Sequence, residues 1–212
     1  MKKIREKAPE KVWVDFARDQ KISNVQLEKF QAYEKLLSEW NQNINLTAIK
    51  DLSGIVRQHF VDSIVLRDFV DLNKTKLIVD IGSGAGFPGI PLKILYPNLQ
   101  VILIEVSKKK QNFLEAVIDE LELENIEVCG MDWRTFLRTT NAEVDFFITR
   151  AAIDEAELCR MFKPGCTYKN AGLIYWVTDE WQPNPKFEGL IKEYKAYKLG
   201  KKRRRLAFFK LD

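Results

Sequence analysis

The chain has 212 residues, of which 46% are hydrophobic and 30% charged, an ordinary composition for a globular protein of one domain with a small appendage. No apolar run approaches the roughly 20 residues of a membrane-spanning helix, and the charged first residues lack the apolar stretch of a signal peptide. The three cysteines show no CxxC spacing, which argues against disulfides and structural zinc. We expect a cytoplasmic protein without a membrane or metal partner.

Positive charge is concentrated at the two ends of the chain. Residues 1–21 contain seven Lys or Arg and four acids, and residues 186–212 contain ten and three. The formal net charge of the whole chain is only +4, so the middle is net negative. If both ends lie on one face, that face attracts a polyanion such as a nucleic acid. Solubilising ends explain the same charges, and the charge pattern alone leaves both interpretations open.

The N-terminal third has the pattern of helices. Ser23 and Gln26 fit a capping box at the start of a first long helix, and the polar stretch Asn41–Asn45 ends it. Apolar residues at helical spacing predict a second helix over Leu52–Val70. We expect residues 1–72 to form a helical extension that packs on the remaining chain.

From Leu77 onward, predicted strands alternate with predicted helices. This alternation is typical of an α/β fold with a largely parallel sheet covered on both faces. Two last runs predict a C-terminal hairpin that adds an antiparallel strand, so residues 73–212 would form a Rossmann-like domain. The predicted strands are Leu77–Ile81, Val101–Glu105, Ile126–Cys129, Asp145–Thr149, Leu173–Val177, Tyr194–Leu199 and Leu206–Leu211, and the predicted helices among them are Gly89–Tyr96 and Lys109–Leu123.

A glycine-rich loop follows the first predicted strand. Glycines at the end of a buried strand let the backbone bend sharply and approach a ligand closely. Glu105 ends the next strand, about where an acidic side chain meets ribose hydroxyls in this architecture. The loop also matches the dinucleotide pattern GxGxxG, but Asp80 would be poorly placed beside a pyrophosphate, and Pro88 lacks an N–H for a phosphate. These two details favour S-adenosylmethionine over NAD.

Several separate motifs occur in the order found in one family. With them, the chain resembles the RsmG (GidB) family, whose enzymes methylate N7 of a guanine in small-subunit ribosomal RNA. The resemblance covers roughly residues 36–152 and fades beyond them. The motifs are Asn45–Ala48, His59–Ser63, Asp80–Gly89, Gly89–Leu92, Lys109–Lys110, Phe113–Leu114, Leu121–Asn125 and Arg150–Ala151.

The resemblance implies S-adenosylmethionine as the cofactor and indicates which residues contact it. At one corner the chain departs from the family, because Asp132-Trp133-Arg134 stands where the family carries Arg, a small residue and Glu. We hypothesise that Asp132 binds the adenine amino group and that Trp133 walls the adenine pocket. The predicted cofactor residues are Asp80, Gly82, Ser83, Gly84, Gly86, Phe87, Glu105, Val106, Ser107, Asp132, Trp133, Arg134 and Arg150.

Guanine N7 carries a free lone pair, so its methylation needs no general base, and the sequence shows no catalytic triad. The Asn/Asp-Pro-Pro-aromatic motif of amine methylases is absent, since residues 148–151 read Ile-Thr-Arg-Ala, and no cysteine follows a proline. Arg150 is the one candidate for a direct role, at guanine O6 or the cofactor carboxylate, and a salt bridge under the sheet is its structural alternative. His59 is better explained as a hydrogen-bonded residue between helices than as a catalyst.

The run Lys201-Lys202-Arg203-Arg204-Arg205 is predicted at the tip of the terminal hairpin, where it would grip RNA phosphates. The sequence thus predicts a monomeric methyltransferase for guanine N7 of 16S ribosomal RNA, acting on the RNA or on a partly assembled small subunit. Two alternatives stay open: a methyltransferase of the same fold with another target, and a catalytically dead RNA-binding or assembly protein.

Overall fold

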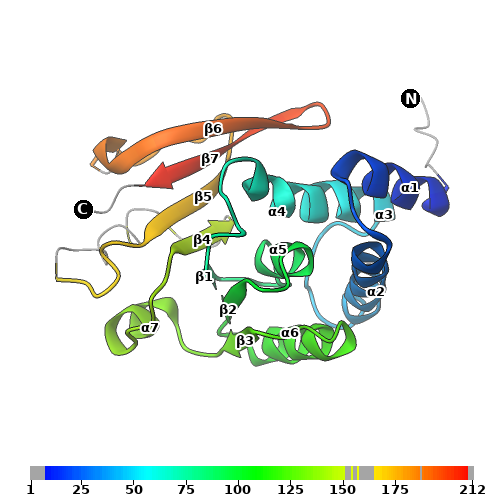
Figure 1. Ribbon diagram of the computed structural model, residues 1–212, viewed down its shortest axis with the longest axis horizontal. Helices are drawn as coiled ribbons and strands as arrows, with labels where there is room; N and C mark the ends of the chain where they lie inside the picture. Colours follow the sequence, from blue (N-terminus) through cyan, green and yellow to red (C-terminus); the bar gives the residue numbers. More distant parts are fainter. Residues whose placement is uncertain (1–7, 151–153, 155–156, 158–164, 187, 210–212) are drawn as a thin grey trace.

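The computed structural model describes residues 8–150, 154, 157, 165–186 and 188–209. In this part of the chain, one sheet of seven strands runs in the order β3-β2-β1-β4-β5-β7-β6 (Figure 1). Its strands are β1 Leu77–Ile81, β2 Gln100–Ile104, β3 Ile126–Cys129, β4 Phe146–Arg150, β5 Gly172–Thr178, β6 Ile191–Leu199 and β7 Lys202–Phe209. The α/β fold and all the predicted strands are therefore confirmed, apart from shifts at their ends.

The first five strands are parallel, and the order reverses between β1 and β4, which is the topological switch point of the sheet. The register pairs Ile81 with Ile104 and Ile104 with Cys129, so β1, β2 and β3 end side by side. In open α/β sheets, ligands bind outside these carboxyl ends. The predicted glycine loop follows β1 at this point, and the fold thereby places it where a ligand site is expected.

The hairpin of β6 and β7 completes the sheet, with β7 antiparallel to β5. The prediction that the basic run forms the hairpin tip was wrong. Strand β7 begins at Lys202, so only Gly200 and Lys201 lie in the turn, and Arg203–Arg205 pair with β6 inside the sheet. The arginines and the apolar residues after them belong to one continuous strand, so the hydrogen-bonded pairing with β6 includes the arginines. The end of the predicted last strand, beyond Phe209, lies outside the described residues.

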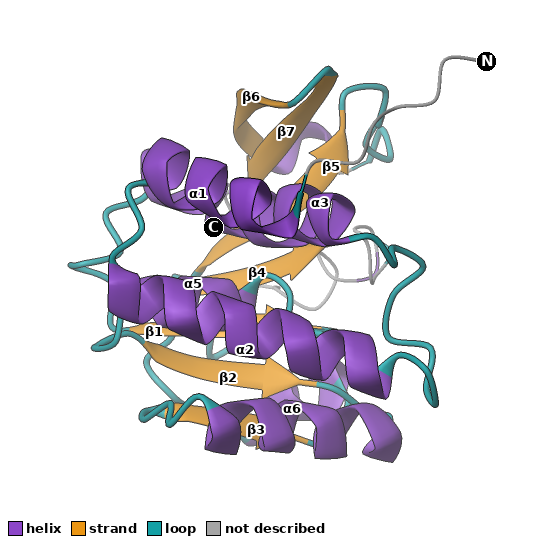
Figure 2. Ribbon diagram, turned by 90° about the vertical axis from the view of Figure 1, so that its right-hand side faces the viewer, coloured by secondary structure: helices purple, strands orange, loops and turns teal. Residues whose placement is uncertain are grey.

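The helices form a layer on each face of the sheet. Helices α1 (Pro9–Gln20), α2 (Asn24–Trp40), α5 (Gly89–Leu95) and α6 (Lys108–Glu120) cover one face, and α7 (Trp133–Thr139) lies on the other (Figures 1 and 2). The predicted capping box is present, since Ser23 and Gln26 exchange hydrogen bonds at the start of α2. The short helix η3 (Glu188–Leu190) precedes β6.

The second predicted helix is continuous but changes its winding. It runs through α3 (Leu52–Ile55), the π-helix η1 (Val56–Val61), α4 (Asp62–Ile64) and the 3-10 helix η2 (Val65–Asp68). Segments of π-helix are rare in proteins overall, and many of those that occur lie at functional sites. His59 lies within this π-helix and Asp62 directly follows it, and both side chains are buried.

One hydrophobic core joins the N-terminal helices to the sheet. Phe16, Phe30 and Phe60 from the helices belong to the same cluster as Ile78 and Leu103 from the strands. A second cluster fills the opposite face, under α7. The division into residues 1–72 and 73–212 stays a prediction, because the two parts share this core. No helix in the described ranges is long and apolar enough to cross a membrane.

Candidate functional site

The loop after β1 is shaped by glycines in left-handed backbone conformations. Gly82, Gly84 and Gly86 have φ angles of 68°, 62° and 90°, which side chains with a Cβ rarely adopt. The backbone N–H groups of Gly82 and Ser83 donate to the Ile104 carbonyl, so β1 and β2 stay joined as the loop leaves the sheet. A Cβ on Gly84 would meet only the Gly82 carbonyl, at 3.9 Å, and this glycine therefore faces open space.

Two other glycines allow close packing beneath the loop. A Cβ on Gly86 would lie 2.5 Å from the Ile90 side chain and 2.8 Å from the Tyr33 hydroxyl. A Cβ on Gly89 would lie 2.5 Å from Leu103. Buried Tyr33, from α2, donates a hydrogen bond to the Ala85 carbonyl. The N-terminal helices thus brace the loop from behind, a contact that its local sequence does not reveal.

Glu105 lies directly after β2 and is held against the loop. Its side chain is buried, Oε2 accepts from the Gly84 N–H at 3.0 Å, and Oε1 accepts from the Ser107 N–H at 2.9 Å. Each carboxylate oxygen keeps a lone pair for a further donor. Val106, which lies between Glu105 and Ser107, is 64% exposed, so this segment lies at the protein surface. This arrangement suits a pair of ligand hydroxyls, the role predicted for Glu105.

Asp80 connects the sheet to the loop through one oxygen and leaves the other without a partner. Its Oδ2 accepts from the Gly89 N–H at 2.8 Å, which fixes the start of α5. Its Oδ1 and the Ser83 hydroxyl are buried, and neither has a hydrogen-bond partner among the described residues. Burial raises the pKa of Asp80 to about 7, with nearby Glu105 adding to the rise. Unpaired buried polar groups at a loop suit a polar, cationic ligand.

The corner at β3 and α7 is shaped by the N-cap of the helix. Asp132 caps α7, and its Oδ1 accepts from the N–H groups of Arg134 and Thr135. Trp133 is 7% exposed and packs into the core of the α7 face. Arg134 stacks on Trp133 and forms an ion pair with Glu157. Contact of Asp132 with adenine stays a prediction. Both of its carboxylate oxygens accept hydrogen bonds within the first turn of α7.

Arg150 ends β4 and reaches the π-helix instead of open solvent. Its guanidinium donates to the Gln58 carbonyl at 2.9 Å and to Asp62 at 3.3 Å, and it lies 3.1 Å from His59 Nδ1. It also lies 5.2 Å from the centre of the Phe87 ring. The salt bridge that was the structural alternative for Arg150 is thus present, with Asp62. Arg150 also borders the glycine loop, through Phe87.

His59 is a hydrogen-bonded residue between structural elements, as expected. Since a guanidinium only donates, His59 Nδ1 accepts from Arg150, and Nε2 donates to the Thr47 hydroxyl at 2.7 Å. The imidazole stacks on Phe87 with ring centres 4.5 Å apart. Burial and the charge of Arg150 lower the pKa of His59 to about 3, so the ring is neutral. Both nitrogens are engaged, which leaves no role as a base.

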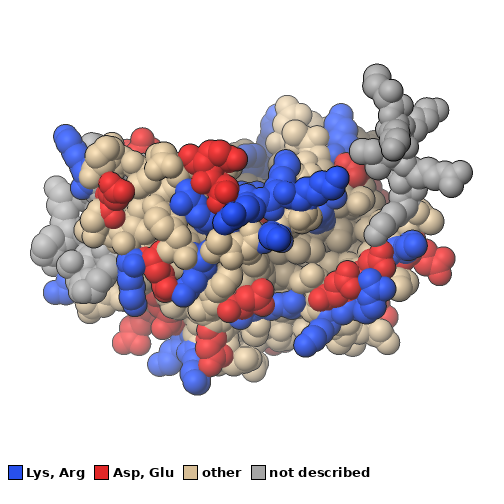
Figure 3. Space-filling view, turned by 90° about the horizontal axis from the view of Figure 1, so that it is seen from above, with Lys and Arg blue, Asp and Glu red and all other residues tan. Residues whose placement is uncertain are grey.

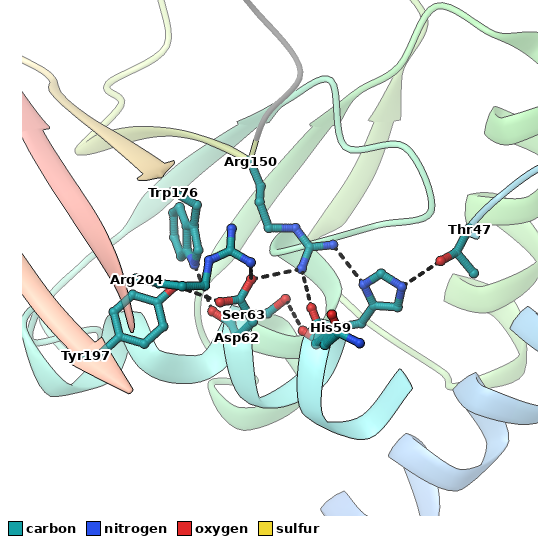
Figure 4. A network of polar contacts seen from close by, with 9 residues as sticks. Thr47, His59, Asp62, Ser63, Arg150, Trp176, Tyr197 and Arg204 are labelled. Atoms are coloured by element: carbon teal, nitrogen blue, oxygen red, sulfur yellow. Dashed lines mark hydrogen bonds and ion pairs between the residues drawn. The ribbon is translucent and has the colours of Figure 1, made fainter. Parts of the chain in front are cut away.

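Asp62 lies at the centre of this network, although its role was not predicted from the sequence (Figure 4). Its side chain is 0% exposed, Oδ1 accepts from the Tyr197 hydroxyl at 2.6 Å, and its carbonyl accepts from the Trp176 indole at 2.7 Å. Arg150 and Arg204 both pair with Oδ2. One helical residue thereby joins β4, β5, β6 and β7. The one sequence feature that could have indicated this role is the presence of an acidic residue, Asp62, within an otherwise apolar helical pattern.

The predicted RNA-binding run divides between the inside and the outside of the protein. Lys201, Lys202 and Arg203 are exposed, whereas Arg204 reaches inward to Asp62. Arg205 donates to the Trp181 carbonyl at 2.6 Å and lies over the ring of an exposed tyrosine of β6. Viewed over the hairpin, lysines and arginines gather in a band across the surface (Figure 3). No group of metal-ligating side chains occurs in the described part of the chain.

A comparison with known families matches residues 26–186 to the model of one family, GidB, described as rRNA small subunit methyltransferase G. Relatives named ribosomal RNA small subunit methyltransferase G include one from Aster yellows witches'-broom phytoplasma, 44% identical over 133 residues. Another, from Lactococcus lactis, is 36% identical over 159 residues, covering 74% of this chain and 66% of the relative. With the phytoplasma protein, the match spans 62% of each chain, less than two thirds of the relative's length.

Solved structures share the fold at low sequence identity. A SAM dependent methyltransferase from Aquifex aeolicus is 20% identical, with a TM-score of 0.52 over 75% of this chain and 94% of that one. A human methyltransferase 10 domain containing protein is 16% identical, with a TM-score of 0.56 over 85% and 96%. These likenesses establish a Rossmann-like methyltransferase fold. The match of residues 26–186 to the family model shows that the chain belongs to the GidB family.

Proposed function

We propose that this protein transfers a methyl group from S-adenosylmethionine to N7 of a guanine in 16S ribosomal RNA. The observation that carries the proposal is the loop of Gly82–Gly86 closed against Glu105 at the switch point of the sheet, in a chain of the GidB family. The names of its relatives, which specify small-subunit ribosomal RNA, support the substrate.

The residues present fit this cofactor. Glu105 offers two carboxylate oxygens to the ribose hydroxyls, and the open side of Gly84 leaves room beside them. Asp80 and Ser83 hold unpaired polar atoms for the cationic end of the ligand. We keep Trp133 as the proposed wall of the adenine pocket, although most of its indole packs in the core under α7. When bound, the cofactor supplies a methyl group on a sulfonium, which is an activated leaving group.

The chemistry asks the protein for positioning and exclusion of water, because guanine N7 has a free lone pair and needs no base. The site agrees with this demand. His59 is neutral and bonded at both nitrogens, and Arg150 has a guanidinium that does not deprotonate in proteins. Arg150 is the side chain best placed to orient a substrate acceptor such as guanine O6.

The exposed part of the basic run would hold the RNA backbone. Lys201, Lys202 and Arg203 lie at the hairpin turn and the start of β7, at the same end of the sheet as the carboxyl ends of the parallel strands. Phosphate contacts of this kind are independent of sequence. We extend the proposal to a cytoplasmic monomer that acts on the RNA or on a partly assembled small subunit.

Calorimetric titration with S-adenosylmethionine, with NAD as the control ligand, tests the cofactor. We expect micromolar binding of the first only. Gly84→Asp places a carboxylate in the open side of the loop, where it would abolish binding while the fold persists, because no side chain lies against that position. Undiminished affinity in this variant would refute the location of the site.

Methylation of small-subunit RNA, mapped by chemical cleavage at 7-methylguanine, tests the reaction. A folded protein that binds the cofactor but methylates neither 16S RNA nor small-subunit particles would contradict the proposed substrate. Changing Lys201, Lys202 and Arg203 to glutamine should weaken RNA binding and lower its salt dependence. An unchanged salt slope would remove the hairpin from the RNA site.

A further inference from the structure

Two guanidinium groups converge on one buried carboxylate oxygen beside the glycine loop. Arg150 Nη1 lies 3.3 Å and Arg204 Nη1 3.2 Å from the same Oδ2 of Asp62. The other oxygen, Oδ1, accepts the Tyr197 hydroxyl. The two arginines therefore stand side by side although they come from β4 and β7, as Figure 4 shows.

This cluster carries more positive than negative charge. Within the described residues, Asp62 is the one acid at ion-pair distance from either guanidinium, so one positive charge has no counterpart. The Nε of Arg204 is buried and has no hydrogen-bond partner among those residues. An uncompensated charge away from water costs free energy, and a bound anion offsets that cost.

The position of the cluster relates it to both proposed ligands. Arg150 lies over the Phe87 ring of the cofactor loop, and Arg204 belongs to the basic run of the hairpin. Their side chains are 14% and 22% exposed, so both keep some contact with solvent although they pair with a fully buried carboxylate. A ligand group that entered here would meet two fixed, planar donors.

We propose that Arg150 and Arg204, held together by Asp62, bind a single anionic oxygen group of a substrate. The inference rests on the proposed function, which supplies two such groups: a phosphate of the RNA and the carboxylate of S-adenosylmethionine. Guanidinium forks bind both groups through paired charge-assisted hydrogen bonds. Asp62 is a positioning residue, because it orients the two arginines and is itself shielded from the ligand.

Arg204→Gln tests the site, and Arg138→Gln, an exposed arginine of α7, is the matched control for the loss of one charge. Calorimetry measures binding of S-adenosylmethionine and of 5′-methylthioadenosine, which lacks the carboxylate. Filter binding measures the affinity for 16S RNA. We expect Arg204→Gln to weaken the ligand that bears the anion by about tenfold, the effect of losing one hydrogen bond between charged groups. The control should bind all three as the wild type does.

The two sources of the anion give different results. Weaker binding of S-adenosylmethionine with unchanged methylthioadenosine identifies the carboxylate. Weaker RNA binding with unchanged S-adenosylmethionine identifies a phosphate. If a folded Arg204→Gln protein binds all three ligands like the wild type, the anion site is refuted. That result differs from failure of the proposed function, in which the wild-type protein itself binds neither cofactor nor RNA.

A measurement on the wild-type protein keeps the test decisive if the variant does not fold. Sodium sulfate and sodium chloride are compared at equal ionic strength, with sulfate as the probe anion. Sulfate raises the thermal midpoints of proteins without a specific site, so the readout is ligand affinity, and we expect sulfate to compete with the ligand that carries the anion. Equal ligand affinities in the two salts would overturn the proposal.

Discussion

The glycine loop and the network around Asp62 lie next to each other but are built in opposite ways. In the loop, the carboxylates of Asp80 and Glu105 bond to Gly89 and Gly84, only 9 and 21 residues away, and the brace from Tyr33 in α2 is the long-range exception. In the network, Asp62 bonds to Arg150, Trp176 and Tyr197 across 88, 114 and 135 residues. A short motif therefore encodes the first region, and only the folded sheet assembles the second.

The two regions also differ in what carries their chemistry. The loop uses backbone N–H groups to hold the carboxylates of Glu105 and Asp80, and its glycines matter because they lack side chains. The network presents charged side chains whose geometry depends on each other. A change in the loop should act locally, whereas loss of Asp62 should release several elements together, because buried polar networks are cooperative.

The sharpest test of this difference is Asp62→Ala, compared with Asp179→Ala. Removing Asp62 leaves two guanidinium groups without their buried partner, so we expect a loss of about 3–5 kcal/mol in the free energy of unfolding. Asp179 also faces two arginines, at 3.7 and 4.0 Å, but is 35% exposed, and its removal should cost at most about 1 kcal/mol. Urea denaturation measures both. Equal losses would mean that Asp62 is not the centre of the network.

Asp80 predicts a pH dependence that originates in the loop. Its pKa is raised from 3.8 to about 7 by burial, so the folded state holds a proton that the unfolded state releases. The stabilisation is complete below about pH 4 and is lost as the pH rises through 7, a change on the order of 4 kcal/mol at most. Urea denaturation at several pH values should show this slope in the wild type and not in Asp80→Asn. Parallel pH curves for the two proteins would contradict the assignment.

Gly86→Ala and Gly84→Ala separate packing from backbone strain within the loop. Both residues have positive φ, but only at Gly86 would a Cβ collide with Ile90 and Tyr33. We expect a loss of about 3 kcal/mol for Gly86→Ala and about 1 kcal/mol for Gly84→Ala. Thermal unfolding of both variants measures the difference. A larger loss at Gly84 would show that the loop is not braced from below as described.

His59 offers the smallest energetic effect and the cleanest signal, because it is the only histidine in the chain. Its pKa, lowered to about 3, predicts a neutral ring with the proton on Nε2 between pH 5 and 8. Nitrogen-15 NMR of the ring reads the tautomer directly. Thr47→Val removes the acceptor of that proton and should cost about 1 kcal/mol. A midpoint near the usual pKa of 6.5 in the wild type would disprove the buried network at His59.

Local sequence was sufficient for much of this protein. Strand β3 has the predicted bounds, the capping box at Ser23 is present, and the glycine loop follows β1 with Glu105 closing it. These features depend on patterns within short windows: apolar periodicity, a cap at fixed spacing and glycines after a buried strand. Their physical causes act between near neighbours, and for this reason the sequence reveals them.

The tertiary structure decided which charged residues face inward. Arg203 and Arg204 are adjacent in one basic run, yet the first is exposed and the second pairs with Asp62. Strand pairing with β6 and β5 causes this, because successive residues of a strand point to opposite faces. The inward side depends on what packs there, and Asp62 arrives from a helix far away in the chain. The sequence shows five cations in a row, and the register of the sheet determines the surroundings of each one.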